Sequence, residues 1–182
     1  MKRVALIGMG NIMFCDEGVG TYLAKYIEHN YKIPDNLEIV DGGLMGFSLM
    51  SYYQEFDKLI IVSTNSKKGE VGEISTYDAD TMLKLGQTRA SANEVEVAMM
   101  IEICSIKDDM AEVEFATIIP KNIEDVKNGL TKEILNKMPN LLETTLNLLQ
   151  KEGITLEKKD KTLSFSEIID MVANPTQEIK LG

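Results

Sequence analysis

The sequence has few of the side chains on which many hydrolases and metalloproteins depend. Its 182 residues include one histidine, His29, and two cysteines, Cys15 and Cys104. The cysteines stand far apart and form no CxxC pair, so neither a disulfide framework nor a zinc knuckle is predicted. With a single histidine and no HExxH segment, the chain offers neither a Ser–His pair of defined order nor a zincin site. No catalytic residue is therefore assigned from the sequence.

Basic side chains and long apolar runs are also scarce. The chain has 19 lysine and arginine residues against 29 aspartate and glutamate residues, a net charge of −10. Nucleic acids and anionic membranes carry the same sign of charge, so neither is expected as a partner. No apolar run approaches the roughly 20 residues that cross a bilayer. The first run, Val4 to Ile7, is too short for a signal peptide. We expect a cytoplasmic protein with reduced cysteines.

The composition that remains, 44% hydrophobic and 26% charged, is that of a globular protein. The apolar patterns predict strands over residues 2–7, 37–40, 59–62, 72–77 and 112–119, helices over 19–30, 47–54, 91–105 and 131–153, and a loop-rich stretch over 78–88. Alternating strands and helices indicate a single three-layer α/β/α domain, with a mostly parallel twisted sheet of about five strands between helices.

The predicted domain spans residues 1–153, and residues 154–182 form a carboxyl-terminal extension. We expect Pro139 to kink or restart the longest helix. In the extension, Ser164 and Glu167 have the capping-box spacing that begins a short helix. The favoured interpretation is a structural one, in which this helix packs on its own domain. The alternative is that it docks on a partner.

A glycine-rich loop follows the first strand. Gly8-Met9-Gly10 suggests a dinucleotide-binding turn, with Asp41 at the end of the next strand to hold a ribose. The G-x-G-x-x-G fingerprint lacks its third glycine because Met13 stands there. Two carboxylates further along the loop, Asp16 and Glu17, would repel a pyrophosphate. An enzyme with a nucleotide cofactor is therefore the less favoured interpretation.

The same residues indicate a different kind of site. Glu17 follows the first strand, Asp41 with Gly42-Gly43 ends the second, and Ser63 ends the third. Sites in open α/β sheets form at the carboxyl ends of strands, so we expect these residues to share one crevice. A hard or borderline metal suits such an acidic, glycine-lined cleft. Asp16 has a structural alternative, because the start of a helix stabilises an anionic side chain.

These motifs resemble those of a known family. Gly8-Met9-Gly10-Asn11-Ile12-Met13 followed by Asp16-Glu17-Gly18-Val19-Gly20 is similar to the opening motif of the hydrogenase maturation endopeptidases. Asp41-Gly42-Gly43 with Gly46 resembles the second motif, and Ile119-Pro120 with Gly129-Leu130-Thr131 before a long helix resembles the carboxyl-terminal pattern. The similarity runs from residue 1 to about Gly153.

The resemblance implies a peptidase that acts on the large-subunit precursor of a nickel–iron hydrogenase. Such proteins bind the precursor after nickel insertion and remove a short carboxyl-terminal extension. No permanently bound cofactor is implied, because the nickel is recognised in the substrate. The cleft and substrate-binding positions that the motifs supply are Gly10, Asn11, Asp16, Asp41, Gly42 and Gly43.

The resemblance also implies three nickel-recognition positions, two of which are substituted. Family members use a Glu in the first motif, an Asp after the third strand and a His at the start of a later helix. Glu17 retains the first position, while Ser63 and Asn93 occupy the other two. A hydroxyl and an amide are poorer nickel ligands than a carboxylate and an imidazole. His29 cannot replace them, because the helix places it about 18 Å from Glu17. Cys15 is either a soft ligand beside Glu17 or a small semi-buried side chain.

Two functions follow from this pattern. The first is an active processing protease that recognises its substrate with Glu17 and with different residues at the other two nickel-recognition positions. The second is a catalytically degenerate relative that docks on a hydrogenase precursor or maturation factor as a scaffold or chaperone. The family favours the first, and the substituted positions Ser63 and Asn93 favour the second.

Overall fold

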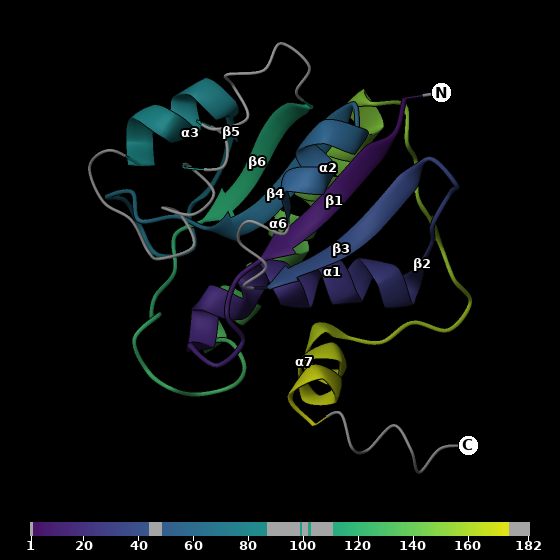
Figure 1. Cartoon of the computed structure of the whole chain (residues 1–182). Helices are drawn as coiled ribbons and strands as arrows, with labels where there is room; N and C mark the ends of the chain where they lie inside the picture. The colour runs from purple at the N-terminus through teal and green to yellow at the C-terminus, as the bar shows by residue number, and fades with distance from the viewer. Residues whose placement is uncertain (1, 44–48, 87–98, 100–101, 103–110, 175–182) are drawn as a thin grey trace.

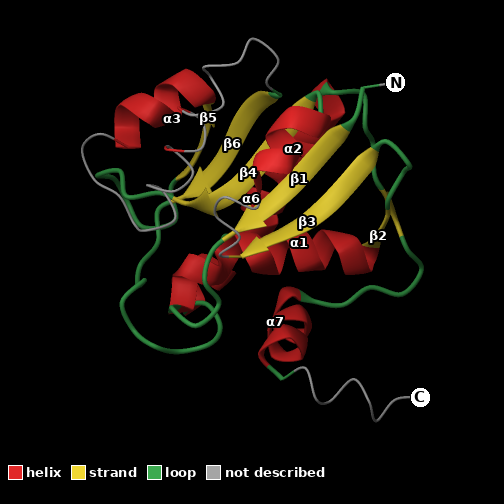
Figure 2. Cartoon of the chain, viewed as in Figure 1, coloured by secondary structure: helices red, strands yellow, loops and turns green. Residues whose placement is uncertain are grey.

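A five-stranded sheet forms the centre of the molecule (Figures 1 and 2). The computed structural model describes residues 2–43, 49–86, 99, 102 and 111–174. The strand order is β3-β1-β4-β6-β5, with bounds β1 Val4–Met9, β3 Leu37–Gly43, β4 Lys58–Thr64, β5 Ile74–Asp78 and β6 Glu112–Ile118. All neighbours run parallel except β5, which pairs antiparallel with β6 at the edge. The predicted mostly parallel sheet of about five strands is confirmed.

Helices cover both faces of this sheet. Their bounds are α1 Val19–Asn30, α2 Met50–Glu55, α3 Ala79–Gly86 and α6 Met138–Lys151. Along β1, Leu6 packs in the core formed with α1 and α6, and Ile7 packs in the core formed with α2 and α3. All six residues of β1 are buried, as expected of a parallel strand with both faces covered. The predicted three-layer α/β/α arrangement is confirmed.

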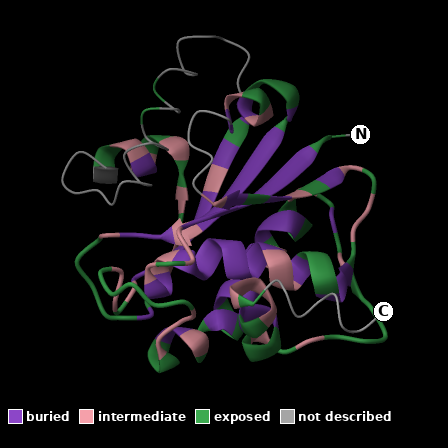
Figure 3. Cartoon of the chain, turned by 60° about the horizontal axis from the view of Figure 1, so that its bottom comes forward, coloured by how far each residue is buried: buried purple, intermediate pink, exposed green. Residues whose placement is uncertain are grey.

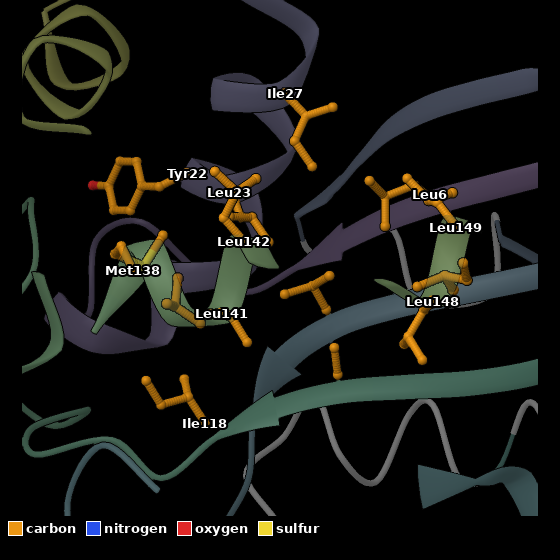
Figure 4. Packing of buried hydrophobic residues seen from close by; sticks show 14 of the residues in the cluster. Leu6, Tyr22, Leu23, Ile27, Ile118, Met138, Leu141, Leu142, Leu148 and Leu149 are labelled. Carbon is orange, nitrogen blue, oxygen red and sulfur yellow. The ribbon is translucent and has the colours of Figure 1, made fainter. Parts of the chain in front are cut away.

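The larger core lies between the sheet, α1 and α6. Figure 4 shows Leu23 of α1 and Leu141 of α6 directed toward this shared interior. The chain enters α6 through a short helix, α5 (Lys132–Leu135), and α6 then begins at Met138 with Pro139 in its first turn. A proline there removes no helical hydrogen bond, because the first N–H groups have no intrahelical partner. The predicted helix restart is confirmed.

Residues 79–86 form a helix, α3, where the sequence pattern predicted a loop-rich stretch. The Asp78 carboxylate accepts the N–H of Thr81 at 2.8 Å, and Met82 is buried against the sheet. Hydrogen bonds from Thr81 lower the pKa of Asp78. The cap and the apolar side chains of Ala79, Met82 and Leu83 therefore stabilise this helix. The predicted helix over 91–105 lies almost entirely outside the described residues.

The extension after residue 153 packs against α1. Strand β7 (Glu157–Lys158) pairs antiparallel with β2 (Tyr31–Lys32), which follows α1. Helix α7 (Phe165–Ala173) begins with the predicted capping box, and the Phe165 ring stacks on Tyr26 of α1 with centroids 3.9 Å apart. The interpretation that this helix packs on its own domain is confirmed.

Burial is concentrated in the sheet and in the inward faces of the helices (Figure 3). The helices present polar residues to solvent on their outer faces. Among the residues described, no helix is both long enough and apolar enough to cross a membrane.

Candidate functional site

Neighbouring parallel strands end at one edge of the sheet, and this edge holds the predicted site residues (Figure 1). Gly8 of β1 pairs with Asp41 of β3 on one side and with Val62 of β4 on the other. Ser63 of β4 pairs with Thr117 of β6. The strand ends therefore bring Asp41 and Ser63 to the edge at which the glycine-rich loop leaves β1, as the sequence predicted.

Two glycines allow α1 to begin directly on these strand ends. A Cβ atom on Gly8 would lie 2.2 Å from the Gly20 carbonyl oxygen, and one on Gly20 would lie 2.2 Å from the Val62 carbonyl oxygen. Carbon–oxygen contacts this short are not possible, so both positions need a residue without a side chain. The close approach sets the 3₁₀ turn η1 (Cys15–Gly18) beside β4.

Glu17 lies in η1 next to Gly10. The Gly10 N–H donates to the Gly43 carbonyl oxygen at 3.2 Å, and its φ of +142° favours glycine. A Cβ atom on Gly10 would lie 1.8 Å from the Glu17 carbonyl oxygen. Glu17 is half-buried, and its N–H donates to the Phe14 carbonyl oxygen at 3.0 Å. The Glu17 backbone is therefore fixed against the ends of β1 and β3.

Asp41 is joined to the same loop through Thr21, a residue that sequence reasoning missed. The buried Thr21 hydroxyl lies 3.2 Å from the Gly10 carbonyl oxygen and 3.2 Å from Asp41 Oδ1. Asp41 itself is exposed, and a Cβ atom on Gly42 would meet Ile7 at 2.7 Å. The position of Thr21, one residue after Gly20 in the first turn of α1, is the signal that could have identified it.

The two remaining residues predicted for the cleft, Asn11 and Asp16, stabilise the loop itself. Asn11 Oδ1 accepts the Met13 N–H at 3.0 Å, which closes a turn of the type that asparagine favours. Asp16 is completely buried, so its carboxylate does not face the solvent at the strand ends.

The Asp16 carboxylate instead joins η1 to the loop between β6 and α5. The N–H groups of Lys121, Asn122 and Thr131 donate to it at 3.0, 2.9 and 2.7 Å, and the Thr131 hydroxyl donates at 3.0 Å. The Asp16 N–H in turn donates to the Asn122 carbonyl oxygen at 3.0 Å. Asp16 stands in the first turn of η1, as the structural alternative predicted, but its carboxylate binds a distant loop and not the amides of its own turn.

The end of β4 carries a buried polar cluster that the sequence did not reveal. Ser63 is half-buried, and Asn65, two residues further along, is buried and donates to the Thr117 hydroxyl at 2.6 Å. The Thr117 hydroxyl donates to the Ser75 carbonyl oxygen at 3.3 Å. This network ties β4, β6 and β5 together beside Ser63. Asn93, the third position of the predicted set, lies outside the described residues.

The edge offers oxygen donors and no complete metal centre. Within the described ranges, no group of three His, Cys, Asp or Glu side chains is arranged to hold a metal ion. His29 is exposed in the last turn of α1, the helix end at which it was predicted. Cys15 is buried, and burial, followed by the charge of Asp16, raises the pKa of its thiol. The chemistry available is that of carboxylates, with Asp41 exposed near the end of β3 and Glu17 half-buried in η1.

Several known proteins are similar to this chain in sequence and in fold. The family model for hydrogenase maturation proteases matches residues 21–148. The hydrogenase 2 maturation protease of Escherichia coli K12 is 27% identical over 154 residues, which cover 84% of this chain and 93% of that protein. The hydrogenase expression/formation protein HupD of Bradyrhizobium diazoefficiens is 25% identical over 170 residues, which cover 91% and 88%.

Solved structures of hydrogenase maturation proteases have the same fold as this chain. The hydrogenase maturating endopeptidase HybD from Escherichia coli superposes with a TM-score of 0.81 at 26% identity, covering 86% of this chain and 98% of that one. The [NiFe] hydrogenase maturation protease HybD from Thermococcus kodakarensis has the same fold, with a TM-score of 0.66 at 20% identity over 80% of this chain and 98% of that one.

Proposed function

The chain belongs to the hydrogenase maturation protease family, and we propose that it hydrolyses a peptide bond near the carboxyl end of a nickel–iron hydrogenase large-subunit precursor. Proteins of this family act on hydrogenase large-subunit precursors. Water is added across the bond, which leaves a new carboxylate on the subunit and an amine on the released peptide. The observation that carries the proposal is the family match together with the position of Glu17 at the glycine-lined strand ends.

In this proposal the nickel ion belongs to the substrate, and this protein recognises it there. Glu17 of η1 supplies one carboxylate, and Asp41 near the end of β3 supplies another. Nickel accepts oxygen and nitrogen ligands, so a substrate that brings the remaining ligands can present its ion here. Because Ser63 and Asn93 are weaker ligands than Asp and His, recognition depends more heavily on Glu17.

Substitution of Glu17 by glutamine tests this assignment. The amide keeps the size of the side chain but removes the charge that binds nickel, so we expect Glu17→Gln to slow cleavage about a hundredfold or more, equivalent to about 2.7 kcal/mol. The measurement is the intact mass of a nickel-loaded precursor over time. Glu28→Gln, an exposed substitution near the end of α1, is the matched control and should cleave at the parent rate. Equal rates for the parent and Glu17→Gln would refute the role of Glu17.

Restoring the substituted positions gives the converse experiment. The double variant Ser63→Asp with Asn93→His returns a carboxylate and an imidazole to the two positions. We expect it to bind nickel-loaded precursor about tenfold more tightly and nickel-free precursor unchanged. A docking protein without catalysis would instead bind the precursor stably and leave its mass unchanged.

A further inference from the structure

Two large apolar side chains stand exposed next to the turn that carries Glu17. Met13 is 55% exposed and Val126 is 73% exposed, and they are two of four exposed large hydrophobic residues in the part of the chain that the structure describes. Single exposed apolar residues are common on protein surfaces, whereas neighbouring ones indicate an interaction site. Met13 and Val126 therefore form such a site only if the fold fixes them beside each other.

Backbone hydrogen bonds fix the two side chains on adjacent segments. The Lys127 N–H donates to the Met13 carbonyl oxygen at 2.9 Å, and the Cys15 N–H donates to the Lys127 carbonyl oxygen at 2.9 Å. These bonds form a parallel bridge between Phe14 and Lys127. Val126 directly precedes the bridge on one segment and Met13 on the other. We call this pair, Met13 and Val126, the apolar lip.

The apolar lip is preorganised and has a charged border. The buried Asp16 carboxylate holds both segments through its bonds to the loop after β6, so little ordering remains to be lost on binding. Glu124, Asp125 and Lys127 are exposed around Val126 and carry charges of both signs. An apolar centre with a polar, charged border is the usual anatomy of a protein–protein interface.

The position of the lip determines what would cover it. Met13 precedes Glu17 by four residues, so their Cα atoms lie at most about 14 Å apart. A standard interface buries about 800 Å² on each partner, which corresponds to a circle of about 16 Å radius. A protein that brings its metal to Glu17 and buries a standard area around it therefore reaches Met13, and with it Val126 on the other side of the bridge.

From this geometry we propose that the apolar lip is a docking surface for an apolar patch of the hydrogenase precursor, an inference that rests on the proposed function. The lip contributes affinity without contacting the metal. It therefore acts on the nickel-free and the nickel-loaded precursor alike, whereas Glu17 distinguishes between the two.

The test measures the affinity of the full chain for nickel-free and nickel-loaded precursor by a direct binding method. Met13→Ser with Val126→Ser should weaken both complexes by the same factor, about tenfold to a hundredfold. Glu17→Gln should weaken only the nickel-loaded complex. Asp35→Ser with Glu55→Ser, two exposed positions at the opposite edge of the sheet, should change neither. Both lip residues are exposed, so unfolding is not expected, and an unchanged thermal midpoint verifies this.

The outcomes separate the two proposals. Parent affinity in the lip variant for both forms of the precursor would overturn the docking surface, as would a parent chain that binds neither form. A parent chain that binds the precursor without cutting it would count against proteolysis and leave the lip result intact. Loss of affinity in the lip variant for the nickel-loaded form alone would assign Met13 and Val126 to metal recognition and overturn the docking surface.

Discussion

At the scale of single residues, the structure separates two neighbouring carboxylates. Asp16 and Glu17 are adjacent in η1, yet Asp16 is completely buried and Glu17 is half-buried beside Gly10. One tight turn therefore buries the first carboxylate and leaves the second residue partly exposed. The fixed position of Glu17 depends on the bonds that Asp16 makes.

Asp16→Asn should reveal this dependence. The amide loses the charge and presents an NH₂ group to N–H donors, so buried donors lose their acceptor. We expect the free energy of unfolding to fall by about 2–4 kcal/mol. Urea denaturation measures the change, and Asp35→Asn, an exposed aspartate in a turn, should stay within about 0.5 kcal/mol of the parent. A loss of less than about 1 kcal/mol for Asp16→Asn would contradict the role given to this carboxylate.

The site was predictable where it depends on strand ends and unpredictable where it depends on distant partners. Asp41 and Ser63 follow successive apolar strands, and parallel strands end at one edge. The Asp16 partners lie 105 to 115 residues away, on a loop with no periodic pattern. The local sequence therefore could not show whether the Asp16 side chain is buried in the protein or lines the cleft at the strand ends.

At the scale of elements, sequence patterns predicted those helices whose caps follow a familiar spacing. The capping box at Ser164 and the proline in the first turn of α6 both appeared as predicted. Helix α3 was missed because it is only eight residues long and its cap, Asp78, is also the last residue of an edge strand. The pair β2 and β7 was missed because each strand has two residues, too few for an alternating pattern.

Ser164→Ala tests the contribution of the cap to α7. The Ser164 hydroxyl accepts the Glu167 N–H at 3.2 Å, and the Glu167 carboxylate accepts the Ser164 N–H at 2.7 Å. Losing the hydroxyl should cost about 1 kcal/mol and speed amide hydrogen exchange in α7. Ser166→Ala, inside the same helix, should leave exchange unchanged or slower because alanine favours helix. Unchanged exchange in the Ser164 variant would show that α7 is held by packing alone.

At the scale of the whole molecule, one buried lysine connects elements at the amino edge of the sheet. The Lys58 side chain is 3% exposed, and its Nζ lies 2.9 Å from Glu112, 3.1 Å from Glu114 and 3.5 Å from Glu152. Burial disfavours its charged form, but the hydrogen bonds that Lys58 donates to Glu112 and Glu114 outweigh this and raise the pKa of Lys58. The network joins β4 and β6 to the end of α6.

Removing this lysine should destabilise the fold in a pH-dependent way. Lys58→Ala removes the buried cation and leaves the three carboxylates only their outer partners, Lys2 and Lys151, so it should cost about 3 kcal/mol near pH 7. The bond from Lys58 lowers the pKa of Glu112 below its ordinary value of 4.5. That stabilisation is present above pH 4.5 and is lost as the pH falls through the lowered pKa. The difference between parent and variant should therefore shrink in acid.

Denaturation across this pH range measures the effect. Lys25→Ala removes an exposed pair with Glu28 and should cost less than about 1 kcal/mol at any pH. A difference between the parent and Lys58→Ala that stays constant from neutral to acidic pH would contradict the electrostatic account of this network.

The fold and family were predictable from order and spacing, because the motifs recur at the ends of successive strands along most of the chain. The role of Ser63 and Asn93 was not predictable, because it depends on what the substrate contributes to the metal. The central claim is therefore that Glu17, in this family fold, supports processing.

The most direct measurement of this claim is the intact mass of a large-subunit precursor mixed with the parent chain, with and without nickel. Processing predicts the loss of a short carboxyl-terminal peptide from the nickel-loaded precursor and none from the nickel-free one. A nickel-loaded precursor that keeps its full mass while it stays bound to the chain would contradict the claim and favour a docking protein.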